Sequence, residues 1–186
     1  AWKSLAGGVP GVGPARRMRA RNLGHGASFG SRIHDEGGGR VRPGPGREPI
    51  LSYEMAPRDL GRLRKAITIL AELSLAAGAR EVYSSVWGFP LIRSLDDARR
   101  MEKAEIDARR IECMAFHPLG SARVGNDARS GVGGDRGEAF DLPGLFVADG
   151  SVLPTSIGVN SQVPIMATAT RIAWGIDERF RLLARR

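Results

Sequence analysis

Hydrophobic residues recur at helical spacing between residues 57 and 77. The positions that share the 3.6-residue repeat are Leu60, Leu63, Ile67, Leu70 and Ser74, with Ile69 and Leu73 beside them. Pro57 suits the first turn of a helix, and Gly78 stands where a C-terminal cap is expected. The pattern therefore predicts one long helix over 57–77.

A second helix is predicted over 96–110, with a different character. Its residues are mostly charged, and Asp96 can cap its start. Met101 and Ile106 are the apolar exceptions, so we expect them to pack inward while the rest of the helix faces solvent.

Short strands are predicted where β-prone residues cluster. The strand candidates are residues 50–53, residues 81–83 and the apolar run 145–148, which reads as a buried strand. Shorter extended pieces are expected at 28–34 and 40–42, separated by a glycine-rich turn at 37–39.

A final helix should begin near Val163–Pro164 and run to about Leu183. Pro164 is tolerated in a helix only within the first turn, which fixes where this helix begins. Upstream, His117 precedes Pro118, and a residue in that position is pushed towards extended geometry, so no helix continues through it.

Composition fits a folded protein of one ordinary domain or two small ones. The chain has 186 residues, of which 42% are hydrophobic and 26% charged. No apolar run reaches the roughly 20 residues of a membrane span. The single cysteine, Cys113, excludes an internal disulfide and is compatible with a reducing compartment, so we expect a cytoplasmic location. Residues 1–25 are expected to be a poorly ordered N-terminal segment.

The net charge of +8 raises the alternative of a basic nucleic-acid-binding module. Against it, the basic residues are nearly all arginines, and outside Arg16–Arg21 they are scattered among acidic neighbours. No helix-turn-helix, zinc finger or RNA-binding motif is visible. Nucleic acid is therefore not the partner we favour.

Three stretches concentrate residues that suggest chemistry: 116–125, 142–151 and 154–166. In the second, Asp149 follows the predicted buried strand, which is where α/β sheets place ligand-binding groups. The third carries Asn160 into a helix N-terminus, whose free N–H groups favour negative charge. The first places His117 beside small residues. A structural histidine, a turn at Asp149 and a capping Asn160 are the plainer alternatives.

Together, the three stretches resemble the C-terminal signature of the glucose–methanol–choline (GMC) oxidoreductases. The first reads His-Pro-Leu-Gly-Ser-Ala-Arg-Val-Gly, the second Gly-Leu-Phe-Val-Ala-Asp-Gly-Ser, and the third Pro-Thr-Ser-Ile-Gly-Val-Asn. They occur in the family's order and spacing. Upstream, 49–53 and 76–79 also look like the family's substrate domain, so the resemblance covers roughly residues 30–180.

The resemblance implies a mixed α+β or α/β fold class. It would be the C-terminal portion of a GMC-type FAD-binding fold, joined to part of an antiparallel-sheet substrate domain. In this division, 26–115 belongs to the substrate-binding domain, and 116–186 is the catalytic and FAD-contacting segment.

The resemblance also implies an activity: oxidation of a small-molecule alcohol at its CH–OH group, with hydride passing to flavin N5. His117 matches the family histidine that takes the hydroxyl proton. Asn160 matches the second catalytic position, where an amide can donate to the substrate oxygen. The residues that match FAD-contacting positions are Asp149, Gly150, Asn160, Ser161, Gln162 and Val163. No metal ligand is implied.

Two features depart from the family pattern. Ser161 replaces the usual proline after Asn160, and Pro164 replaces the usual threonine, so the backbone of this loop is expected to differ. The chain also lacks the strand–Gly-x-Gly-x-x-Gly–helix element of a Rossmann segment. We therefore expect a fragment that needs an N-terminal FAD-binding segment or subunit as its partner. A non-catalytic remnant or subunit of the family is the alternative.

Overall fold

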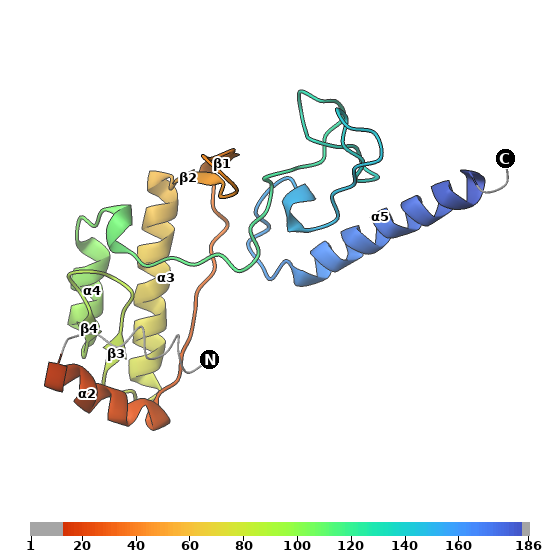
Figure 1. The fold of residues 1–186 in the computed structure, drawn as a ribbon. Coiled ribbons are helices and arrows are strands. Elements are labelled where there is room, and N and C mark those ends of the chain that lie inside the picture. Colours follow the sequence, from red (N-terminus) through yellow and green to blue (C-terminus); the bar gives the residue numbers. More distant parts are fainter. Residues whose placement is uncertain (1–12, 184–186) are drawn as a thin grey trace. The chain divides into compact units, whose positions relative to one another are not determined.

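A computed structural model describes residues 13–183 of the chain (Figure 1). The chain forms two compact units: unit 1 is Ala1–Ile33 with Pro57–Met114, and unit 2 is His34–Ala56 with Ala115–Arg186. The sequence-based division at 115/116 lies one residue from one of these boundaries. Residues 34–56, which we assigned to the substrate-binding domain, are grouped with the C-terminal stretch instead.

The first segment of unit 1 is helical where it is described. Helix α2 spans Gly13–Arg21, and a 3₁₀ turn, η1, follows over Asn22–His25. Of the segment 1–25, for which we predicted poor order, residues 1–12 lie outside the described residues. The predicted extended piece at 28–34 has no regular secondary structure.

Helix α3, Pro57–Ala76, confirms the long helix predicted from the apolar repeat. Its C-terminus closes as a Schellman motif: the N–H of Gly78 donates to Leu75 O at 3.0 Å, and the N–H of Ala79 donates to Ser74 O at 2.9 Å. Gly78 has φ +92°, a conformation in which a side chain would be strained. The glycine therefore ends the helix where the sequence predicts.

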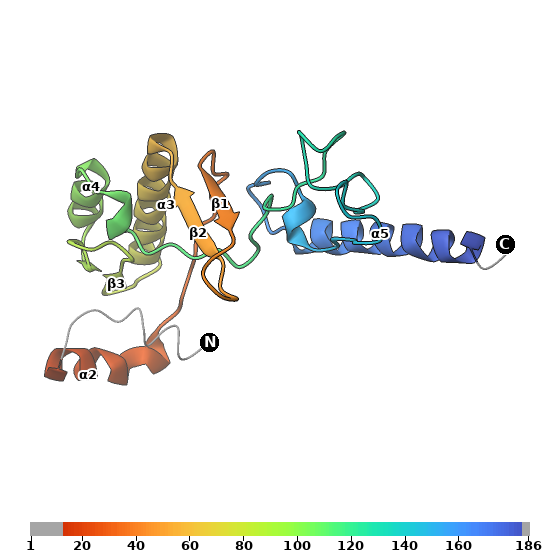
Figure 2. The ribbon, with the colours of Figure 1, turned by 45° about the horizontal axis from the view of Figure 1, so that its top comes forward.

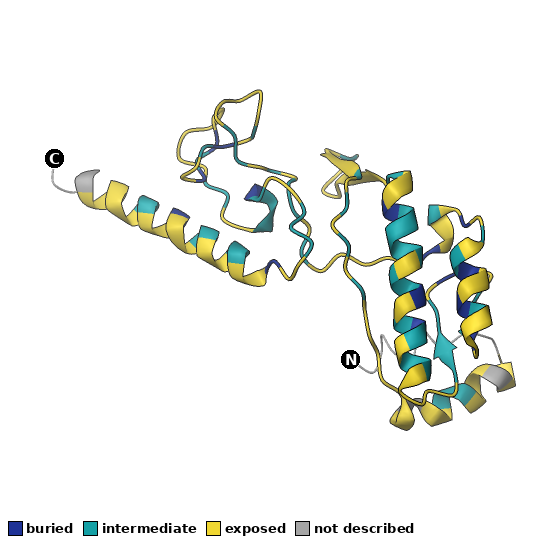
Figure 3. Cartoon of the chain, turned by 180° about the vertical axis from the view of Figure 1, so that it is seen from behind, coloured by how far each residue is buried: buried dark blue, intermediate teal, exposed yellow. Residues whose placement is uncertain are grey.

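The predicted stripe on α3 is partly buried along its length, and Leu60 and Ile67 pack against the core of unit 1; only its flanking residues differ from the prediction. Thr68 and Ala71 are buried, whereas Ile69 and Leu73 are exposed. Small residues face helix α4 (Leu95–Lys103), where Ala98 is also fully buried, because they allow the two helix backbones to approach closely. Figure 3 shows the buried positions of α3 and α4 on their facing sides.

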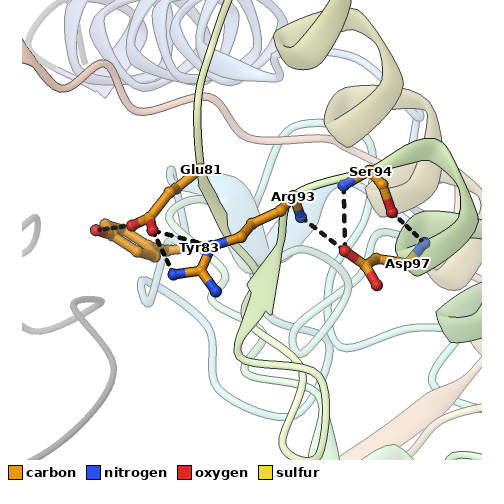
Figure 4. A network of polar contacts seen from close by, with 5 residues as sticks. All are labelled: Glu81, Tyr83, Arg93, Ser94 and Asp97. Atoms are coloured by element: carbon orange, nitrogen blue, oxygen red, sulfur yellow. Dashed lines mark hydrogen bonds and ion pairs between the residues drawn. The ribbon is translucent and has the colours of Figure 1, made fainter.

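Helix α4 is shorter than predicted and is capped by a different residue. Ser94, not Asp96, is the N-cap: its hydroxyl accepts the N–H of Asp97 at 3.1 Å, and the Asp97 carboxylate accepts the N–H of Ser94 at 3.1 Å (Figure 4). This reciprocal capping box needs a carboxylate three residues after the cap, which Ser94 has in Asp97. Met101 and Ile106 are buried, as predicted, although Ile106 lies beyond the helix.

The core of unit 1 is completed by a small antiparallel sheet. Strand β3, Val82–Tyr83, confirms the strand predicted at 81–83 and pairs with β4, Leu91–Ile92. Arg93 joins this sheet through a 2.6 Å ion pair to Glu81, and a further 3₁₀ turn, η2, covers Ala108–Arg110. The buried apolar residues of this core are Ala71, Val86, Ile92, Ala98, Met101, Ile106 and Ile111.

Unit 2 begins with a β-hairpin (Figure 2). Strand β1, Gly38–Arg42, pairs antiparallel with β2, Ile50–Glu54, which confirms the strand predicted at 50–53. Two of the glycines predicted to form a turn lie in β1 instead. Gly39 is needed there because a Cβ would collide with the carbonyl oxygen of Ser52 on the facing strand.

The rest of unit 2 is irregular chain followed by one long helix. The predicted buried strand at 145–148 is not formed: Leu145 is exposed, and Phe146 makes one isolated bridge to Glu138. A strand needs a partner along its length, and the described residues supply only a short one here. The N–H of Ala139 donates to Leu145 O and the N–H of Val147 donates to Gly137 O, each at 2.9 Å. Helix α5, Gln162–Leu183, begins one residue before the predicted start.

Both sheets are antiparallel, and helices make up much of the rest, so the fold is α+β. The α/β alternative requires parallel strands. In the described part of the chain the one parallel pairing is the isolated bridge between Val124 and Gly133. Among residues 13–183, we find no helix with the length and apolar character needed to cross a membrane.

Candidate active site

The three stretches singled out in the sequence meet within unit 2. The N–H of Ala122 donates to Ser151 O at 3.0 Å, and the N–H of Val124 donates to Val152 O at 3.0 Å. These two hydrogen bonds lay the chain after His117 alongside the segment that contains Asp149 and Gly150. The first and second stretches are therefore neighbours in the fold.

Gly150 is the point at which all three stretches approach one another. A Cβ at this position would lie 3.0 Å from Ile165 Cδ1 on helix α5 and 3.0 Å from the carbonyl oxygen of Pro118. The residue before Pro118 is His117, and Ile165 lies in the turn of α5 that follows Asn160. The absence of a side chain at Gly150 thus permits the close packing of the three motifs.

His117 lies in an irregular part of the first stretch and is half-buried. Its imidazole has no hydrogen bond to another residue of the described chain, and none joins it to Asn160. Because Pro118 packs against Gly150, the backbone beside His117 is held at the meeting point. A common target for the imidazole of His117 and the carboxamide of Asn160 remains a prediction from sequence.

Asn160 is exposed and precedes helix α5. Its Oδ1 accepts the N–H of Gln162, the first residue of the helix, at 3.0 Å. The Oδ1 atom of the amide therefore caps the helix. The Asn160 NH₂ group makes no hydrogen bond to any described residue, so it remains able to donate to a ligand.

The start of α5 offers few free backbone donors. Gln162 gives its N–H to Asn160, Pro164 has none, and the N–H of Ile165 donates to Ser161 O at 2.9 Å. Within the described chain, the N–H groups of Ser161 and Val163 have no hydrogen-bond acceptor. The positive end of the helix dipole is thus presented chiefly through these two groups.

Asp149 caps a 3₁₀ turn, η3, over Gly150–Val152. Its Oδ1 accepts the N–H of Ser151 at 2.8 Å and the Ser151 hydroxyl at 2.6 Å. The hydroxyl hydrogen bond, followed by that of the N–H, lowers the pKa of the Asp149 carboxyl below its usual value. The carboxylate stays ionised at neutral pH, and its Oδ2 makes no hydrogen bond inside the described chain.

Two of the residues predicted to contact FAD offer hydrogen-bonding atoms that suit part of this cofactor. Asp149 Oδ2 is an acceptor suited to a hydroxyl, as found on a ribityl chain, and the Val163 N–H is a donor suited to a carbonyl or an anionic atom. Val163 itself is 74% exposed, so this donor stands at the surface of the unit. Ser161, in contrast, is buried, which makes its side chain part of the packing.

One neighbour of the site was not predicted from sequence. His34 packs against Gly158, where a Cβ would lie 3.1 Å from the His34 Cβ. Gly158 has φ +70° and lies two residues before Asn160. The two residues that make this contact are 124 positions apart, and no motif in the sequence links them.

Comparison with known proteins identifies the family. The family model for GMC oxidoreductases matches residues 39–169. An uncharacterized GMC-type oxidoreductase of Mycobacterium tuberculosis is 36% identical over 147 residues, covering 79% of this chain and 23% of that protein. A long-chain-alcohol oxidase of Arabidopsis thaliana is 30% identical over 188 residues, covering 89% of this chain and 23% of its own length.

The 5-(hydroxymethyl)furfural oxidase of a Methylovorus species is 30% identical over 131 residues, covering 63% of this chain and 24% of that enzyme. The chain thus spans about a quarter of the length of these curated relatives. The family model matches well over half of the chain and includes all three motifs. This chain belongs to the GMC oxidoreductase family and carries its C-terminal region.

Proposed function

We propose that this chain forms the substrate side of an FAD-dependent oxidoreductase that oxidises the CH–OH group of a small-molecule alcohol. Family membership supports this proposal, as do relatives named as a long-chain-alcohol oxidase and a 5-(hydroxymethyl)furfural oxidase. The single observation that carries it is the packing of the three motifs around Gly150. That packing brings the backbone beside His117 and the first turn of α5 to one place.

In this proposal, His117 accepts the proton of the substrate hydroxyl. A neutral imidazole is an effective general base near neutral pH, and no hydrogen bond within the described chain occupies its ring nitrogens. Asn160 cannot act as a base, because an amide does not take up a proton at such pH. His117 therefore handles the proton alone.

Asn160 donates a hydrogen bond from its NH₂ group to the substrate oxygen as negative charge develops there. Its Oδ1 is held by the N–H of Gln162, so the amide is fixed with its donor side available. A donor held in place before the reaction stabilises developing charge without reorganisation. Capping of α5 and catalysis thus use opposite sides of the same amide.

FAD, when bound, would supply the acceptor for the hydride of the alcohol carbon. The residues that would hold it are Asp149, with its free Oδ2, and the backbone of Gly150 and of Ser161–Val163. The Val163 N–H is the donor best placed at the helix terminus. We propose that a further FAD-binding segment or subunit supplies the remaining contacts.

The proposal is tested with protein expressed from the complete gene, by flavin absorbance and a panel of alcohols. The panel should include long-chain primary alcohols and 5-(hydroxymethyl)furfural, which the names of two relatives suggest. His117→Ala should abolish alcohol-dependent flavin reduction while flavin stays bound. Turnover equal to that of the wild type would refute the role given to His117.

A matched pair of variants separates the capping role of Asn160 from its proposed role as a hydrogen-bond donor to the substrate. Asn160→Asp keeps an oxygen that accepts the Gln162 N–H but has no NH₂ donor, whereas Asn160→Ala loses both. Both variants should reduce flavin about 10²–10³-fold more slowly, as expected for loss of one oxyanion donor. Only the alanine variant should lose about 1 kcal/mol of stability through the missing cap. Near-normal flavin reduction in Asn160→Asp would leave Asn160 with a capping role alone.

A further inference from the structure

The loop that carries Asn160 has little backbone anchoring. Within the described chain, no backbone hydrogen bond joins residues 154–160 to another segment, and these residues form no helix or strand. At its start, Pro154 O lies 3.4 Å from the position of a Cβ on Gly120. At its end, Asn160 caps α5. Between these points, side-chain packing must set the position of the loop.

His34 supplies packing contact in the middle of this loop. A Cβ built on Gly158 would lie 3.1 Å from the His34 Cβ, 3.6 Å from its Nδ1 and 3.7 Å from its Cα, so the base of the His34 side chain and one edge of its ring face the glycine. The positive φ of Gly158 turns the chain at this point. Because Asn160 is only two residues further on, a shift of Gly158 moves the carboxamide with it.

His34 is itself attached to the hairpin of the same unit. The next residue, Asp35, accepts the hydroxyl of Tyr53, in strand β2, at 3.1 Å. The hairpin is held by the continuous ladder between β1 and β2. Contacts through Asp35 and His34 therefore connect strand β2 to Gly158.

We propose that His34 is a positioning residue that holds the loop 154–160 and thereby sets the placement of the Asn160 amide. Its part in catalysis rests on the function proposed above, whereas its effect on the loop does not. His34 works through Gly158 and touches neither Asn160 nor a reacting group in this assignment. Contact between the His34 side chain and Gly158 carries the role.

The first test measures the loop without any catalysis, by amide hydrogen exchange of the full chain followed by NMR. In His34→Ala, the amide of Gln162, which donates to Asn160, should exchange about ten-fold faster. The amide of Ala122, which donates to Ser151 in the same unit, should be unchanged. Faster exchange at both amides would indicate general unfolding and overturn the assignment, as would no change at Gln162.

His34→Phe is the matched control, because it keeps a ring against Gly158 but removes both nitrogens. It should protect the Gln162 amide as the wild type does. A phenylalanine variant that behaves like His34→Ala would show that the imidazole nitrogens are required, and packing would then not be the mechanism.

The second test links the loop to the reaction. His34→Ala should lower kcat about ten-fold with KM changed by less than about two-fold, because the Asn160 hydrogen bond matters mainly in the transition state. In an Asn160→Ala background the same change should have no further effect on kcat. Additive losses would overturn the proposed route through Asn160. Faster Gln162 exchange in a protein whose wild type oxidises no alcohol would instead reject the proposed function alone.

Discussion

The packing of the loop 137–147 on helix α5 gives a sharp prediction about one glycine. In Gly137→Ala, the new Cβ would lie 2.7 Å from Ile172 Cδ1 and 2.8 Å from Val147 O. Ile172 is only 1% exposed, so its side chain cannot swing out to solvent. Such overpacking costs about 1–3 kcal/mol. The φ of +76° adds about 1–2 kcal/mol for a residue other than glycine.

Gly144→Ala is the control that separates the two costs. Gly144 has φ +87° in the same loop, but a Cβ there meets no atom within 4 Å. Gly137→Ala should therefore destabilise unit 2 by about 1–3 kcal/mol more than Gly144→Ala. In a unit of roughly a hundred residues, each kcal/mol lowers Tm by about 4–8 °C, a difference that calorimetry resolves. Equal Tm values for the two variants would refute the close packing of this loop on α5.

Two further predictions concern the helices. Hydrogen bonds from the Arg93 N–H, then Arg100 and Ser94, lower the pKa of Asp97 to about 2. Because the folded pKa lies below the unfolded value of about 4, the stabilisation is present above about pH 4 and is lost as pH falls through about 2. Asp97→Asn should therefore flatten the fall of Tm with acid over this interval, and an unchanged pH profile would contradict the capping box. Gly175→Ala, in α5, should raise stability by up to about 1 kcal/mol in urea unfolding, since a Cβ there meets no atom within 4 Å; a loss would reveal packing that the structure does not show.

Signals between near neighbours in the chain were read correctly from sequence. Helix α3 follows from a 3.6-residue repeat that ends at Gly78, and α5 begins within the turn that Pro164 allows. The N-cap predicted for α4, Asp96, was wrong. Ser94 and Asp96 both suit an N-cap, but only Ser94 has a carboxylate three residues later to complete a capping box.

The family could also be recognised from the sequence, because each of its three motifs is a short, contiguous stretch. His117, Asp149 and Asn160 were each found from the stretch in which they occur. Their plainer roles coexist with the proposed ones: Asp149 caps η3, and Asn160 caps α5. Sequence could not show that capping engages Oδ1 of Asn160 and not its NH₂ group, since that depends on which atom the helix terminus contacts.

By itself, the sequence determined helices α3 and α5, strand β2 of the hairpin, the order of the three motifs and the family to which they belong. Tertiary structure decided that Ile69 and Leu73 of α3 are exposed, that 145–148 is not a strand, and that His34 lies against Gly158. The reason is the range of the interactions. Caps and turns act over a few residues, whereas burial and strand pairing depend on partners that the chain brings together only when it folds.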